Sequence, residues 1–229
     1  MSERARPPLE SMPRAGVDRA LLRRYSVLFW DFDGVIKDSV EVKGAAFERL
    51  FAPFGAELAT RVRRHHEQHG GVSRYEKLRQ YLRWAGEPAS DAQVDGYCDL
   101  FSAAVRQAVI DSDWVPGARE YLQENHGRQT FILVSATPQR ELEGIVRAVG
   151  GSEWFHAIHG SPVAKADAIA SSLAELKCAR DDALVIGDSD SDYEAATKAG
   201  IAFLLRRTTF NAALQGRYTG PACLHFGDG

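Results

Sequence analysis

Apolar and polar residues follow one another along most of this chain in a pattern that predicts repeated strand and helix units. Runs of strand-forming residues stand at 25–30, 130–134, 156–158, 183–186 and 202–205. Apolar residues at helical spacing fill the segments between the later runs, at 118–125, 138–149, 165–176 and 193–199. Strands that are apolar on both faces are typical of a parallel sheet covered by helices, with right-handed crossovers. The pattern after residue 208 is weak, and only 223–226 is predicted there, as an edge strand.

The stretch from residue 39 to residue 110 has a different pattern, that of helices interrupted by glycine and proline. Val42, Ala46 and Leu50 share one helical face, and Ser73 with Glu76 has the spacing of a helix-capping box. A helical block between two α/β segments predicts an inserted domain. The expected fold class is α/β, a Rossmann-like core with a mainly parallel sheet and an all-helical cap domain. The expected organisation is an N-terminal tail at 1–22, the core at 23–37 and 115–229, and the cap at 38–114.

Composition narrows the class of protein. The 229 residues are 45% hydrophobic and 26% charged, which is ordinary for a globular protein. The net charge of −3 gives no electrostatic reason to expect nucleic acid or an anionic membrane as a partner. No apolar run suits a signal peptide or a membrane span. Three widely separated cysteines indicate neither a disulfide framework nor a zinc site, so a reducing cytoplasm is expected. The expected partner is a small phosphate ester, and the expected state is a monomer or homodimer.

Polar residues directly follow the predicted strands, and one more opens a helix. In a parallel sheet the carboxyl ends of the strands lie at one edge, where ligands bind. Gly34 permits the turn that lets Asp31 and Asp33 approach one centre, since alternate residues of an extended strand face opposite ways. The residues expected at this edge are Asp31, Asp33, Ser135, Ala136, Thr137, Lys165, Asp188 and Asp192.

These residue types predict phosphoryl transfer. Asp31, Asp33 and Asp188 would repel one another if they converged without a countercharge, and Mg²⁺ is the cation that suits carboxylate ligands and an anionic substrate. The Ser135 hydroxyl, the Lys165 ammonium and backbone amides at a helix start suit a phosphate group. Pro138 is expected in the first turn of that helix.

The order DFDGV, VSATP, a lysine and GDSDSD resembles the four motifs of the haloacid dehalogenase superfamily of phosphatases and phosphomutases, over residues 26–206. The resemblance implies that Asp31 is a nucleophile that forms an aspartyl-phosphate, and that Asp33 acts first as general acid and then as general base. It also implies that Ser135 and Lys165 hold the phosphoryl group, with Gly34, Ala136 and Thr137 in contact with substrate.

The same resemblance implies a metal site and a cap. Mg²⁺ would be bound by Asp31, the Asp33 carbonyl and Asp188, while Asp192 would reach it through water or orient Lys165. Asp33 must be protonated in one step and ionised in the next, so its surroundings are expected to raise its pKa. Dehalogenases of the superfamily lack this second aspartate, so it favours phosphate chemistry.

The predicted cap resembles that of the phosphoglycolate phosphatase and β-phosphoglucomutase branch. Residues 71–74 resemble the mutase loop, and Arg74 and Lys77 are neighbours on a helix that could clamp a carboxylate or a distal phosphate. Either cation could instead pair with Glu67 or Glu76. The three histidines His65, His66 and His69 are expected on a solvated face.

Three functions follow from these motifs. The mutases have a histidine where this chain has Lys43 and a glutamate where it has Gly187, so the expected function is a Mg²⁺-dependent phosphatase of a small sugar phosphate or acidic phosphate. A phosphosugar mutase is the alternative. An aspartate-phosphorylated signalling domain is less favoured, because its acceptor follows a later strand and it has no helical insertion.

Overall fold

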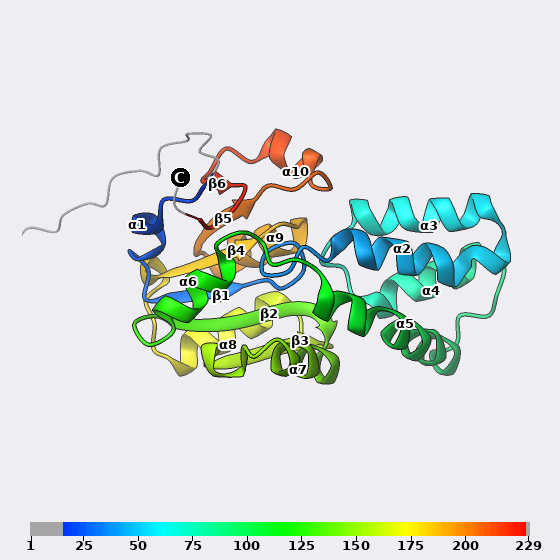
Figure 1. Cartoon of the computed structure of the whole chain (residues 1–229), viewed down its shortest axis with the longest axis horizontal. Helices are drawn as coiled ribbons and strands as arrows, with labels where there is room; N and C mark the ends of the chain where they lie inside the picture. Colours follow the sequence, from blue (N-terminus) through cyan, green and yellow to red (C-terminus); the bar gives the residue numbers. More distant parts are fainter. Residues whose placement is uncertain (1–15, 228–229) are drawn as a thin grey trace, which may run out of the picture.

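The computed structural model describes residues 16–227 and contains one sheet of six parallel strands. Their order across the sheet is β3-β2-β1-β4-β5-β6, with helices on both sides (Figure 1). This confirms the predicted parallel sheet. An edge strand is present near the C-terminus, but at 222–223 instead of the predicted 223–226. The strands are β1 (Val27–Trp30), β2 (Thr130–Pro138), β3 (Ala157–Ser161), β4 (Ala183–Gly187), β5 (Ala202–Arg206) and β6 (Ala222–Cys223).

Strand β1 lies inside the sheet, between β2 and β4, and all four of its side chains are buried. Leu28 and Trp30 belong to the apolar cluster on one face of the sheet, and Val27 and Phe29 belong to the cluster on the other. A continuous apolar run such as β1 requires this burial on both faces.

Six helices pack on the sheet or around its edges. They are α1 (Arg19–Leu22), α6 (Ala118–Asn125), α7 (Gln139–Ala148), α8 (Lys165–Glu175), α9 (Asp190–Ala199) and α10 (Ala212–Arg217), among the described residues.

The register of the strands brings their ends to one level. Trp30 pairs with Leu133 of β2 on one side and with Ile186 of β4 on the other. The polar residues that come next along the chain therefore meet at one edge of the sheet. The placement of Pro138 differs from the prediction. It pairs with Ser161 of β3 in an extended conformation, so helix α7 begins one residue later and Pro138 is its N-cap.

Four further helices form a separate group, which we call the helical unit. They are α2 (Val40–Phe51), α3 (Ala56–Gln68), α4 (Arg74–Trp84) and α5 (Asp91–Asp111). Figure 1 shows them together at one end of the molecule, beyond the sheet. Aromatic rings fill their centre, with Phe47 stacked on Phe101 at 3.9 Å between centroids and Phe51 against Tyr81. The interior of the unit is apolar, and it is continuous with the apolar cluster on one face of the sheet.

The chain enters and leaves the helical unit through two segments that lie side by side. The Asp38 amide donates to the Asp113 carbonyl, and the Val115 amide donates to the Ile36 carbonyl. Of the predicted N-terminal tail at 1–22, residues 1–15 lie outside the described residues. The described remainder packs on the core, where Val17 and Leu22 are buried and the Val17 amide donates to His225.

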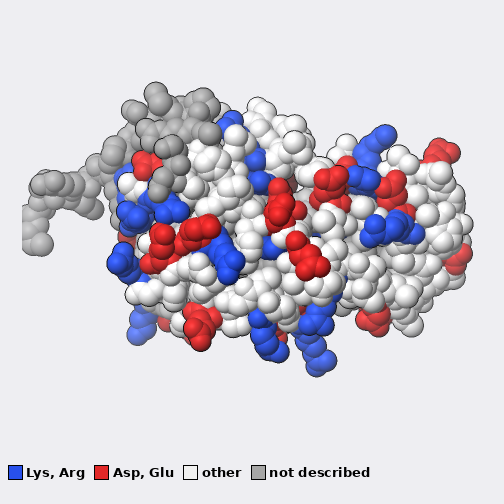
Figure 2. Space-filling view, in the orientation of Figure 1, with Lys and Arg blue, Asp and Glu red and all other residues white. Residues whose placement is uncertain are grey.

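The surface shows no large region of one charge on the face drawn in Figure 2, where acidic and basic residues are interspersed over the sheet region and the helical unit. Among the helices of residues 16–227, none combines the length and the apolar character that a membrane span requires.

Candidate active site

The predicted residues Asp31, Lys165 and Asp192 lie together at the carboxyl edge of the sheet. Lys165, the first residue of α8, places its Nζ 3.0 Å from Asp31 Oδ1 and 2.6 Å from Asp192 Oδ1. The other oxygen of Asp192 accepts hydrogen bonds from the Ser189 amide and hydroxyl, as a capping box at the start of α9. Burial alone would lower the pKa of Lys165, but the charges of Asp192 and Asp31 outweigh it and raise that pKa. Lys165 is therefore a fixed cation beside Asp31.

Three buried carboxylates form a possible cation site. Asp31, Asp188 and Asp192 each offer an oxygen, and these atoms all lie within 4.8 Å of one another. Burial first, and then the charge of Asp192, raise the pKa of Asp31 to about 7. Burial and the charge of Asp31 raise the pKa of Asp188 well above its ordinary value. A hard divalent cation would relieve this repulsion, and an all-oxygen donor set fits Mg²⁺.

Gly34 has a conformational role beside this cluster. Its φ of 78° lies in the left-handed region, and a Cβ there would clash with the Asp188 carboxylate. Glycine therefore allows the turn after Asp33 to pass against the acidic cluster. Gly34 is not among the described residues that line the cavity, and its contact with substrate stays a prediction.

Asp33 points away from the acidic cluster and is held by three donors. Lys43 Nζ lies 2.5 Å from Asp33 Oδ2, Thr137 Oγ1 donates to the same oxygen at 3.1 Å, and Ser39 Oγ donates to Oδ1 at 2.5 Å. Burial would raise the pKa of Asp33, but the charge of Lys43 and these hydrogen bonds lower it instead. The prediction of a raised pKa was therefore wrong, because Lys43 of α2 reaches across to the carboxylate.

Ser135, Ala136 and Thr137 line the same cavity from the end of β2. Ser135 is buried and its Oγ accepts a hydrogen bond from the Thr137 amide at 3.2 Å. Thr137 also accepts from Lys43 Nζ at 2.9 Å. The predicted phosphate-binding loop is thus joined to Asp33 twice, directly by Thr137 and through Lys43 of the helical unit.

Arg74 is paired with a carboxylate across the boundary between the helical unit and the core. Its guanidinium donates to both oxygens of Glu141 on α7, each at 2.7 Å, and to Ser102 on α5 at 2.6 Å. Arg74 lines the cavity, but both of its terminal nitrogens are engaged. The expected clamp of Arg74 and Lys77 on one anion is therefore absent, because Glu141 already neutralises Arg74.

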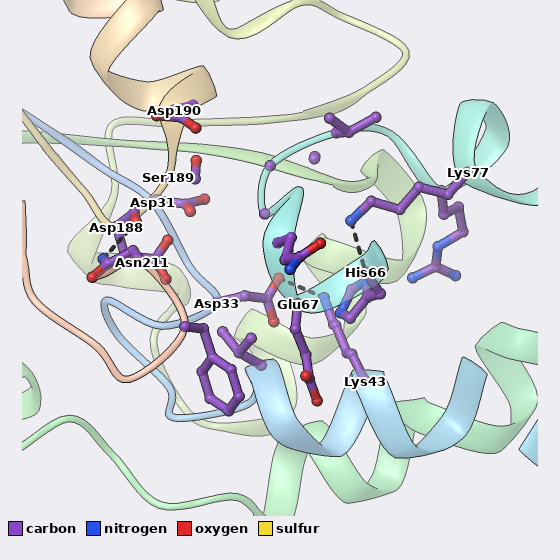
Figure 3. Close-up of a pocket in the computed structure, with 18 of the residues that line it drawn as sticks. Asp31, Asp33, Lys43, His66, Glu67, Lys77, Asp188, Ser189, Asp190 and Asn211 are labelled. Atoms are coloured by element: carbon purple, nitrogen blue, oxygen red, sulfur yellow. Dashed lines mark hydrogen bonds and ion pairs between the residues drawn. The ribbon is translucent and has the colours of Figure 1, made fainter. Parts of the chain in front are cut away.

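Lys77 has a different partner. Its Nζ lies 3.1 Å from Nδ1 of His66, and both residues are buried and line the cavity (Figure 3). The expectation that His66 is solvated was wrong. Its ring packs 4.8 Å from that of Phe47, on the inner face of α3. The many charged residues of α3 led to the prediction that the whole helix is solvated, although the face with His66 packs inward.

The helical unit and the sheet edge line a common cavity. It has a volume of about 100 Å³ and is open to solvent on one side. Gly71 has φ of 76°, and a Cβ on it would clash with Ser191 and Ser189 at the start of α9. The loop between α3 and α4 therefore rests directly on the loop that carries Asp188.

Two residues of this site had no assigned role in the sequence analysis. Lys43 was considered only as a departure from the mutases, although its position four residues before Phe47 puts it on the same helical face. Asn211 lies in the weakly patterned C-terminal segment. Its Nδ2 donates to the Asp188 carbonyl at 2.7 Å and to the Arg206 carbonyl at 2.8 Å, so it fixes the backbone of a candidate metal ligand.

Solved structures with this fold are numerous. A haloacid dehalogenase-like hydrolase from Streptococcus pneumoniae has a TM-score of 0.66 at 19% identity, covering 88% of this chain and 94% of that one. A predicted phosphoglycolate phosphatase from Haemophilus somnus has a TM-score of 0.68 at 16% identity, covering 89% and 95%. A provisionally assigned β-phosphoglucomutase from Thermotoga maritima has a TM-score of 0.63 at 21% identity, covering 87% and 94%. These likenesses concern the fold.

In sequence, no curated protein matches the chain. A family model does match, that of haloacid dehalogenase-like hydrolases, over residues 27–205. This range contains Asp31, Asp33, Ser135, Lys165 and Asp188, the residues that meet at the edge of the sheet. The chain therefore belongs to the haloacid dehalogenase-like hydrolase family.

Proposed function

We propose that this hydrolase is a Mg²⁺-dependent phosphatase that releases phosphate from a small phosphorylated metabolite through an aspartyl-phosphate on Asp31. The observation that carries the proposal is the position of Asp31. Lys165 holds its Oδ1, while Oδ2 has no hydrogen-bond partner among the described residues, and the side chain lines the cavity. A carboxylate held in this way beside a fixed cation is a nucleophile suited to an anionic ester.

The metal is proposed on the chemistry of the acidic cluster. Asp31, Asp188 and the Asp33 carbonyl would hold Mg²⁺, while Asp192 orients Lys165. When bound, Mg²⁺ supplies positive charge that screens the repulsion between the Asp31 carboxylate and the phosphate ester. Asn211 keeps the Asp188 backbone in place for this role, through its hydrogen bond to the Asp188 carbonyl.

The protein residues account for both steps of the proposed reaction. Asp31 attacks phosphorus, the bond from phosphorus to the ester oxygen breaks, and the leaving oxygen takes a proton from Asp33. Lys43 Nζ is 2.5 Å from Asp33 Oδ2, so Lys43 can supply that proton. Lys43 passes the proton to Asp33, and Asp33 donates it to the leaving oxygen. In the second step, Asp33 takes a proton from the attacking water and returns it to Lys43, and the bond from Asp31 to phosphorus breaks. Ser135 and Lys165 hold the phosphoryl group throughout.

The alternative of a phosphosugar mutase has less support. A mutase must bind an intermediate with two phosphates, and the candidate for the second phosphate in the sequence was Arg74. That guanidinium is bonded to Glu141. An aspartate-phosphorylated signalling domain must expose its acceptor to a phosphodonor partner, whereas Asp31 is buried beneath the helical unit.

The proposal is tested by phosphate release from a panel of sugar phosphates, acidic phosphates and nucleotides, with Mg²⁺ and with EDTA. We expect release only with Mg²⁺, and a loss of at least about 10³-fold in Asp31→Asn. The matched control is Asp167→Asn, which alters an exposed carboxylate on α8 and should retain activity. Undiminished hydrolysis by Asp31→Asn would refute the mechanism. Isomer interconversion without phosphate release would identify a mutase, and a phospho-aspartate stable for minutes without turnover would identify a signalling domain.

We also propose a reducing, cytoplasmic location. Cys98, Cys178 and Cys223 are free thiols, and Cys98 and Cys223 are buried. Their use as core residues without disulfides supports this assignment.

A further inference from the structure

Another cavity lies outside the candidate active site, where the helical unit joins the core. It has a volume of about 440 Å³ and is open to solvent. The entry to the helical unit supplies Asp38 and Glu41 to its lining, and the segment that follows β5 supplies residues 206–210. This segment begins with two adjacent arginines, Arg206 and Arg207, which have no part in the proposed reaction.

Arg206 is buried with a weak partner. It is only 8% exposed, and its Nε donates to the Leu224 carbonyl at 3.2 Å. Its Nη1 lies 3.4 Å from Asp38 Oδ1, which is at the long limit of a hydrogen bond, and the Asp38 side chain is 54% exposed. A pair of this kind contributes little. The charge of a buried guanidinium is therefore only partly compensated.

Arg207 is compensated still less. Its Nε is shielded from solvent and has no hydrogen-bond partner, and none of the ion pairs among residues 16–227 includes it. An unpartnered polar group away from water costs free energy. The acidic residue Glu41 does not offset it, because Glu41 lies 3.7 Å from the guanidinium of Arg63 on α3. The lining thus carries two guanidinium groups against one weakly held carboxylate, that of Asp38.

The charge and the shape of these two groups indicate the class of ligand. A guanidinium group binds the oxygens of a phosphate through two parallel N–H donors. Two guanidinium groups balance a dianion, whereas a carboxylate carries a single charge. The exposed Thr209 also lines the cavity and offers a hydroxyl donor. A phosphate group therefore fits this lining better than a carboxylate does.

The loop between β5 and α10 joins this cavity to the active site. Phe210 lines both cavities. The Asn211 side chain donates to the carbonyls of both Arg206 and Asp188, and Figure 3 shows it beside Asp188. A ligand held by the two arginines would therefore touch the loop that fixes the backbone of a candidate metal ligand.

We propose that this cavity is a second anion site, in which Arg206 and Arg207 bind a phosphate group. The anion displaces Asp38 as the partner of Arg206, and it thereby removes a contact between the core and the entry to the helical unit. The ligand is inorganic phosphate or the phosphate group of a metabolite, which share this chemistry. The site goes beyond the proposed phosphatase function, since its binding requires no reaction at Asp31.

The test is isothermal titration calorimetry of the full chain with inorganic phosphate, in EDTA and with Mg²⁺. In EDTA the three carboxylates of the possible cation site disfavour an anion in the active site, so binding that persists reports the second site. We expect Arg207→Met to weaken this binding by about 10- to 100-fold, the range of a hydrogen bond to a charged group. Asp38→Asn should tighten it by up to about fivefold, because the competing partner of Arg206 is then neutral.

Controls separate the ligand class and the source of the phosphate. The matched variant is Arg79→Met, which removes an arginine of α4 whose side chain is 37% exposed and should bind phosphate as wild type does. Acetate should bind less tightly than phosphate. Glycerol phosphate in EDTA distinguishes the two sources, because tighter binding than that of inorganic phosphate indicates a metabolite and weaker binding indicates the free ion.

Three outcomes overturn the inference: no binding of phosphate by wild type in EDTA, equal affinity in wild type and Arg207→Met, and acetate binding as tight as that of phosphate. An affinity that does not rise in Asp38→Asn refutes the displacement of Asp38, and the expected rise cannot come from misfolding. Because the measurement needs no hydrolysis, a failure of the proposed phosphatase function would leave this inference standing.

Discussion

Replacing Glu141 with alanine should destabilise the protein far more than loss of an ordinary surface ion pair. The Arg74 and Glu141 side chains are only 6% and 7% exposed, and they are joined by two hydrogen bonds of 2.7 Å each. Burial would raise the pKa of Glu141, but Arg74 lowers it, so the carboxyl is ionised. Its removal leaves the guanidinium buried without a countercharge, with only the Ser102 hydroxyl as a partner, which costs about 3–5 kcal/mol.

The assay is a double-mutant cycle by chemical denaturation with Glu141→Ala, Arg74→Ala and the double variant. We expect each single variant to lose about 3–5 kcal/mol in the free energy of unfolding, and the double variant to lose less than the sum by about 1–3 kcal/mol. The exposed pair of Arg79 and Asp91, with side chains 37% and 88% exposed, is the control and should couple by less than about 1 kcal/mol. Additivity within about 0.5 kcal/mol at Arg74 and Glu141 would show that the two residues do not interact energetically.

Two further predictions concern closure of the site and its charge. Gly71→Ala should lower kcat/KM strongly, because the new methyl group collides with Ser191. The control is Gly86→Ala, which has the same φ of 76° with open space around it and should lose only about 1–2 kcal/mol of stability. Equal kcat/KM in the two variants would contradict the contact between Gly71 and Ser191. Binding of an anionic substrate in the cavity should weaken by up to about tenfold per pH unit above pH 7, since Lys77, whose pKa burial and Lys43 lower to about 7, loses its proton there. In Lys77→Met this loss of kcat/KM above pH 7 should disappear, and an unchanged pH profile in that variant would show that the charge of Lys77 does not contribute to binding.

The sheet and the residues at its edge could be predicted because each depends on local sequence. An apolar run such as 27–30 has few alternatives to a buried strand, and parallel strands bring whatever follows them to one edge. Asp31, Ser135 and Asp188 were found in this way. Lys165 was found by its place in the sequence between the Ser135 and Asp188 motifs, and its Nζ lies 3.0 Å from Asp31 Oδ1.

The contacts between the helical unit and the core could not be predicted in the same way. The pairing of Arg74 with Glu141 joins residues 67 positions apart, and nothing in either helix indicates the other. The spacing of Arg74 and Lys77 correctly placed them on one helical face. It could not show that Glu141 binds Arg74 and leaves Lys77 with a different partner. His66 was misjudged because α3 is highly charged, although one of its faces packs inward against Phe47.

The pKa of Asp33 shows a further limit. The expectation of a raised pKa came from what the reaction requires of a general acid, and not from neighbouring residues. In the folded chain the nearest charge is Lys43, which stabilises the ionised form. Asp33 and Lys43 can hold the proton together as a pair. The reaction therefore does not require that the pKa of Asp33 itself be raised.

The two adjacent connections at Asp38 and Val115 give the protein a modular character. Their backbone hydrogen bonds to Asp113 and Ile36 fasten the entry and exit of the helical unit to each other. Residues 39–112 are therefore equivalent to one long loop inserted between two adjacent points of the core. The entropic cost of lengthening such a loop is small, about 0.6 kcal/mol for each doubling. Evolution can exchange or reshape such an insertion, with its Lys77 and His66, while the chemistry at Asp31 is left in place.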